Sequence, residues 1–92
     1  MPSTKAVSLG RNPVDPDLDT YEGRMGAHLR ALRERKHWSV DALIEKLSLV
    51  GLDAAKTTIY SWEQGHRLPS MQAVLALSAV YGKNPRLILP EA

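Results

Sequence analysis

Short helical stripes of apolar residues, each bounded by a capping residue, a glycine or a proline, follow one another along this 92-residue chain. No stretch alternates between apolar and polar residues as a half-buried strand does, and no repeat or low-complexity segment is present. A chain of this length forms one small domain, with a core large enough to fold alone. We therefore predict an all-α fold, a compact bundle of five short helices at residues 20–92.

The ends of the predicted helices are marked by residues that start or stop a helix. We expect the starts at Asp19 or Thr20, Ser39, Asp53, Ser70 and Asn84, and the ends near His37, Ser48 to Gly51, Gly65, Gly82 and Pro90. Residues 1–19 contain three prolines and no apolar periodicity, which predicts a flexible, disordered N-terminal arm.

The third predicted helix, at about residues 54–64, has two unlike faces. Ile59 and Trp62 are three residues apart, so they share a side that can point inward. The other face carries one cation, two small hydroxyls and one aromatic hydroxyl, from Lys56, Thr57, Ser61 and Tyr60. Small donors and acceptors near a helix start suit the edges of bases in a DNA major groove. The alternative interpretation is a polar surface helix of a small bundle.

The charged residues are unevenly distributed along the chain. Residues 1–23 hold two Lys/Arg against four Asp/Glu, whereas residues 24–92 hold ten against six. A basic folded part is compatible with a polyanion partner. The chain has no cysteine, which excludes a disulfide framework and a thiolate metal site and favours an intracellular setting. Because no stretch looks like a signal peptide or a bilayer span, we expect a cytoplasmic protein without a membrane partner.

Three motifs, in their order and spacing, carry a resemblance to a known family. They are LRALRERKHWS at 29–39, ALIEKL at 42–47 and TIYSWEQGHRLPS at 58–70, followed by NPRLIL at 84–89. Together they resemble the Cro/Xre family of helix-turn-helix repressors, which has the lambda-repressor-like fold, over roughly residues 24–90. The resemblance implies a sequence-specific DNA-binding transcription regulator that acts as a repressor. It also implies a homodimer on a palindromic operator of double-stranded DNA, with no catalysis and no cofactor, located in the cytoplasm and associated with a bacterial or phage nucleoid.

The resemblance also implies roles for individual residues. The second helix would cross the DNA backbone and the third would enter the major groove. The base-facing residues would be Lys56, Thr57 and Ser61, with Tyr60 beside them. Phosphate contacts would come from Ser39, the backbone amide of Val40, Gln64, His66 and Arg67. Arg33 and Glu63 would form a structural ion pair, and Leu87, Ile88 and Leu89 would be either core or a dimer patch.

Two departures from the family leave the contacts open. Val40 stands where the family often has a glutamine, so the contact made by that glutamine is missing or replaced. The connector between the second and third helices is about five residues longer than the compact family turn. The extra residues either lengthen the third helix or form a loop at residues 49–52. Two other functions stay open, an antitoxin-type autoregulator that holds a partner protein and a helical protein-interaction module without DNA.

Catalytic and metal sites have little support in the sequence. The histidines at positions 28, 37 and 66 lack the spacing of zinc ligands, and no nucleophile motif or phosphate-binding glycine loop is present. Trp38 and Trp62 follow apolar stripes, so we expect both in the core. Tyr60 is the ambiguous aromatic residue, and we favour the DNA-facing side over packing.

Overall fold

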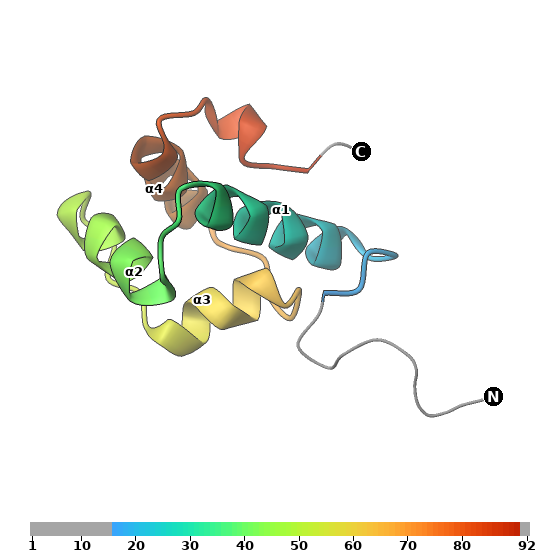
Figure 1. Cartoon of the computed structure of the whole chain (residues 1–92). Helices are drawn as coiled ribbons and strands as arrows, with labels where there is room; N and C mark the ends of the chain where they lie inside the picture. The colour runs from blue at the N-terminus through green and yellow to red at the C-terminus, as the bar shows by residue number, and fades with distance from the viewer. Residues whose placement is uncertain (1–15, 91–92) are drawn as a thin grey trace.

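Four α-helices and a final 3-10 turn make up residues 16–90, the part of the chain that the computed structural model describes. The elements are α1 (Tyr21–Arg35), α2 (Val40–Leu49), α3 (Lys56–Glu63), α4 (Met71–Tyr81) and the 3-10 helix η1 (Pro85–Leu87). Figure 1 shows α1 crossing the middle of the molecule, with α3 on one side of it and η1 on the other. The predicted arm, apart from residues 16–19, lies outside the described residues.

Capping side chains begin three of the α-helices where the sequence predicts. The side-chain oxygens of Thr20, Ser39 and Ser70 accept hydrogen bonds from the amide three residues on, at 2.9, 3.0 and 3.1 Å. Gly82, with φ 65°, ends α4 in the left-handed conformation that favours glycine. None of the helices in residues 16–90 is both long enough and apolar enough to cross a membrane.

The start of α3 is wrongly predicted at Asp53. The helix begins at Lys56, and Ala55 precedes it without a side-chain hydrogen bond. Leu52 and Ala54 pack against the core while their neighbours Asp53 and Ala55 are exposed. This alternation is that of an extended segment, and it holds residues 52–55 out of the helix. The extra residues of the connector therefore form a loop and do not lengthen α3.

The fifth helix is also a correction, because the structure has four α-helices and one 3-10 turn in its place. Asn84 and Pro85 start this turn as predicted, and the Asn84 Oδ1 atom accepts from the Arg86 amide at 3.0 Å. Ile88 is fully buried directly after the turn. Because Ile88 must reach the core and Pro90 follows two residues later, the segment has no room for a second helical turn.

The core lies where the four α-helices meet. Its largest fully buried side chains are Met25, Leu43, Leu47, Ile59, Leu77 and Ile88. Trp62 is buried as predicted, whereas Trp38 is half-buried and stacks on Tyr81 with ring centroids 5.5 Å apart. The Lys46 ammonium lies 4.6 Å from the centroid of the Trp38 ring, so this ring is covered by a cation on its outer side.

Glycines allow α1 to lie directly against the end of α3. A Cβ atom on Gly26 would overlap the Trp62 carbonyl oxygen and would lie 2.6 Å from the Glu63 carbonyl oxygen. A Cβ atom on Gly65, which has φ 78°, would lie 2.7 Å from the Gly23 Cα atom. Glycine inside a helix costs stability relative to alanine. The close backbone contact explains why α1 carries it.

Candidate nucleic-acid interface

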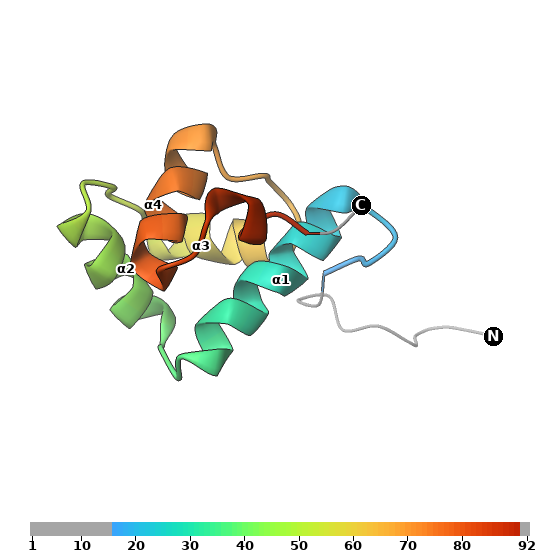
Figure 2. The ribbon, with the colours of Figure 1, turned by 90° about the horizontal axis from the view of Figure 1, so that it is seen from above.

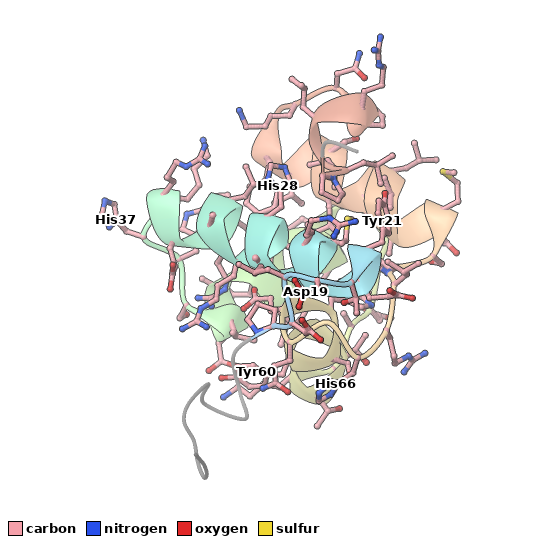
Figure 3. The ribbon with its side chains drawn as sticks, turned by 90° about the vertical axis from the view of Figure 1, so that its right-hand side faces the viewer. Asp19, Tyr21, His28, His37, Tyr60 and His66 are labelled. Carbon is pink, nitrogen blue, oxygen red and sulfur yellow. The ribbon has the colours of Figure 1, made fainter. Side chains whose placement is uncertain are left out.

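The polar face of α3 is open to solvent on the side of α1 that lies away from η1 (Figure 1). Its side chains and those of the loop that follows form what we call the α3 surface, which comprises Lys56, Thr57, Tyr60, Ser61, Gln64, His66 and Arg67. All of these are exposed or half-buried, whereas Ile59 and Trp62 on the other face are buried. Figure 3 shows Tyr60 and His66 together on this side, with His28 on the opposite side.

The Arg33–Glu63 pair fixes the end of α3 from inside the fold. Arg33 donates from Nε to Glu63 Oε2 at 2.7 Å and from Nη2 to Glu63 Oε1 at 2.9 Å. Its Nη1 atom also donates to the Trp38 carbonyl oxygen at 2.9 Å. The hydrogen bond to Glu63 raises the pKa of the Arg33 guanidinium, although burial opposes it. Glu63 is only 5% exposed, so the one carboxylate of α3 is withdrawn from the α3 surface.

The start of α3 differs from the starts of the other three α-helices. No described side chain caps it. Its first turn, like that of α4, also contains no acidic residue. The amides of a first helical turn lack partners within their own helix, and the helix dipole adds a partial positive charge there. Lys56 adds a full positive charge at the same place. This end of α3 is therefore suited to an anionic neighbour.

Asp41 is a member of this region that the sequence analysis missed. It lies in the first turn of α2, and its Oδ1 atom is 3.4 Å from the Lys56 Nζ atom. Both side chains are largely exposed, so the pair adds little stability. Its geometry matters more, because it directs the Lys56 ammonium toward the start of α2. The signal in the sequence is weak, since the two residues are separated by the long connector.

The start of α2 presents a hydroxyl and a backbone amide. The Ser39 hydroxyl already accepts from the Ala42 amide at 3.0 Å, and the Val40 side chain is buried. The Ser39 hydroxyl can still donate its own proton to a phosphate, whereas Val40 has only its backbone amide to offer. After α3, the amides of His66 and Arg67 donate to the Ser61 carbonyl oxygen at 2.9 and 3.3 Å. These bonds hold the loop close to the polar face of α3.

Leu87, Ile88 and Leu89 lie on the opposite side of α1, and their predicted role in a dimer stays a prediction. Ile88 belongs to the core, whereas Leu87 is 57% exposed and Leu89 is 41% exposed. The Nε2 atom of His28 lies 2.7 Å from the Leu87 carbonyl oxygen. Within residues 16–90, no group of three or more His, Asp or Glu side chains is arranged to hold a metal ion.

Comparison with known proteins gives matches that cover most of the chain. A family model described as a helix-turn-helix domain matches residues 24–88. The structure of the S. venezulae BldD DNA-binding domain is similar at 30% identity and a TM-score of 0.62, covering 76% of this chain and 97% of that chain. A crystal structure of the BldD DNA-binding domain gives the same identity and TM-score and is covered over 94% of its length. No curated protein matches.

Proposed function

This chain belongs to the helix-turn-helix domain family of DNA-binding transcription regulators, and we propose that it reads a DNA sequence by placing α3 in the major groove. The observation that carries this proposal is the separation of charge on α3. Its one carboxylate, on Glu63, is held inside by Arg33, while Lys56 and three hydroxyl groups face outward. This arrangement suits a DNA-facing helix, because it keeps the carboxylate of α3 away from the phosphates.

The residues of the α3 surface divide into two roles. Thr57 and Ser61 are four residues apart on one helix face, as are Lys56 and Tyr60, so these four side chains can meet base edges. His66 and Arg67 lie in the loop beside α3, where they can bind the phosphate backbone together with Gln64. The exposed Ser39 hydroxyl and the Val40 amide, at the start of α2, supply the remaining phosphate contacts.

We further propose that the protein binds a palindromic operator as a homodimer and represses transcription without catalysing a reaction. A two-fold symmetric dimer of this fold places its two recognition helices about 34–36 Å apart, one turn of the duplex. The exposed Leu87 and Leu89 supply an apolar surface at and just after η1, which lies on the other side of α1 from α3 (Figure 1). The expected location is the cytoplasm, where the operator is accessible.

Selection of bound duplexes from a random pool tests the proposal. The full chain should enrich a defined sequence, and a mobility shift should then show tighter binding to that sequence than to a scrambled duplex. Lys56→Ala should reduce this preference, whereas Lys83→Ala, which removes an equal charge from the chain between α4 and η1, should leave it unchanged. Absence of any enriched sequence, together with a salt dependence near zero, would support a protein-interaction module or an antitoxin-type partner surface instead.

A further inference from the structure

A groove of about 910 Å³ runs between α1 and the chain after α4. Its charged lining comes from Arg24 and Arg86. His28 also lines it, and no carboxylate is among the described residues that do so. Leu87 and Leu89 form the apolar part. We call this the C-terminal groove. It combines positive charge with exposed leucine side chains, so it suits a segment that is acidic and apolar.

The C-terminal groove is held open by the fold itself. Ile88, between the two exposed leucines, is fully buried and anchors the segment in the core. The contact between His28 Nε2 and the Leu87 carbonyl oxygen, at 2.7 Å, ties the segment to α1. Leu87 and Leu89 are therefore held outward on a fixed backbone, and an occupant would not have to order them.

The same chain carries a segment with the complementary character. Residues 17–22, which we call the acidic turn, include exposed Asp19 and Glu22 together with exposed Leu18 and Tyr21. The turn is ordered by a hydrogen bond from the Thr20 amide to the Asp17 carbonyl oxygen at 3.2 Å. It is joined to the groove side of α1 by Arg24 Nη1, which donates to the Leu18 carbonyl oxygen at 3.2 Å.

We propose that the C-terminal groove of one protomer receives the acidic turn of a second copy of this chain, and that the second groove receives the first turn. Each protomer then contributes the same two surfaces, as a two-fold symmetric interface requires. The exposed Asp19 and Glu22 do not line the groove of their own protomer. The basic side chains of the groove would meet the acidic side chains of the turn around a centre of apolar contacts. This charge complementarity favours one alignment of the two protomers.

The position of these surfaces fits a dimer on one duplex. Figures 1 and 2 both place the acidic turn and the end of the described chain at the end of the molecule where α1 begins. The loop after α3 adjoins this end, since a Cβ atom on Gly65 would lie 3.2 Å from the Glu22 carbonyl oxygen, whereas Lys56 and Thr57 lie at the far end of α3. A two-fold axis at this end can therefore direct both α3 helices toward the same DNA. The inference rests on the proposed homodimer and specifies which parts of the two copies meet.

Charge reversal of the full-length chain, followed by sedimentation equilibrium, tests the pairing. Arg86→Glu makes the groove acidic and Asp19→Arg makes the turn basic. Each variant alone should raise the dimer Kd by about tenfold or more, because like charges then face each other. An equimolar mixture should dimerise nearly as tightly as the wild type, since each altered surface again meets an opposite charge. Lys83→Glu and Asp53→Arg are matched controls, with equal charge changes outside both surfaces.

Three results would overturn the pairing: a wild-type chain that stays monomeric, single variants that dimerise like their controls, or a mixture that does not recover. Binding to a duplex with a single half-site separates this inference from the proposed function. Arg86→Glu and Asp19→Arg should both still bind this duplex, because the α3 surface is unchanged. If the wild type binds no duplex at all, the proposed DNA binding is contradicted, while the proposed dimer is not.

Discussion

Arg33 and Glu63, thirty residues apart in the sequence, meet through two hydrogen bonds that join the last turn of α1 to the last turn of α3. Glu63→Ala leaves the Arg33 guanidinium partly buried without its carboxylate, which should cost about 3–5 kcal/mol of folding free energy. Urea unfolding measures the loss. Glu34→Ala removes the exposed partner of Arg30 and should cost less than about 1 kcal/mol. Equal stability of the two variants would mean that the interior pair contributes nothing.

Gly26→Ala should destabilise the fold, in contrast to the usual effect of this change in a helix. Replacing glycine by alanine in an exposed helix interior stabilises a protein by about 1 kcal/mol. At Gly26 the added methyl group would collide with the Trp62 and Glu63 carbonyl oxygens, so α1 and α3 must separate. We expect a loss of about 1–3 kcal/mol. A raised melting temperature in a thermal scan would show that the two helices are not in close contact.

Tyr81→Phe should change the dependence of stability on pH. Burial, with a smaller contribution from Glu63, raises the pKa of the Tyr81 hydroxyl above its ordinary value. The neutral form is thus favoured in the folded state, and its contribution is lost as pH rises past about 10, the value for the unfolded chain. The wild type should therefore lose more stability above pH 10 than Tyr81→Phe does.

Near neutral pH the same substitution should have an effect within about 1 kcal/mol, because the hydroxyl is buried without a hydrogen-bond partner among the described residues. Tyr60→Phe is the control, since Tyr60 is exposed. Unfolding in denaturant at several pH values compares the three proteins. Identical pH profiles for wild type and Tyr81→Phe would show that the hydroxyl is accessible to water.

Ser61→Ala and Arg67→Ala should separate base reading from backbone binding. If the Ser61 hydroxyl meets a base edge, its removal should weaken specific binding by about 1–3 kcal/mol and leave binding to scrambled DNA nearly unchanged. Arg67→Ala should weaken both, and should lower the slope of log affinity against log salt by about 0.9 for one phosphate. Ser48→Ala, an exposed serine of α2, is the matched control. An equal loss on both duplexes for Ser61→Ala would exclude its base contact.

Helix starts were predictable where a side chain marks them and unpredictable where packing decides. Thr20, Ser39 and Ser70 cap their helices because each hydroxyl can satisfy a free amide. Asp53 has the same local ability, yet the core contacts of Leu52 and Ala54 keep the chain extended past it. A tertiary contact of this kind outweighs a cap of about 1 kcal/mol, and no local pattern encodes it.

The composition of the α3 surface was visible in the sequence, but its surroundings were not. Helical spacing alone predicts that Ile59 and Trp62 are buried and that Lys56 is exposed, and the structure confirms this. Two features depend on how separate elements pack, so the sequence alone does not reveal them. They are the contact between Asp41 and Lys56, and the C-terminal groove. The close approach of α1 to α3 did leave a signal, because two glycines three residues apart, Gly23 and Gly26, are costly in a helix without a packing reason.

The loop at residues 50–55 gives the molecule a site that tolerates added length. Gly51, with φ 91°, would have nothing within 4 Å of a Cβ atom, so the chain there faces open space. The contacts that hold α2 and α3 come from Leu47 and Ile59, which are buried outside the loop, and from Leu52 and Ala54, which pack against the core after Gly51. A short reporter peptide inserted after Gly51 would add only a small loop-closure entropy. It would place a spectroscopic label beside α3 without changing the packing of that helix.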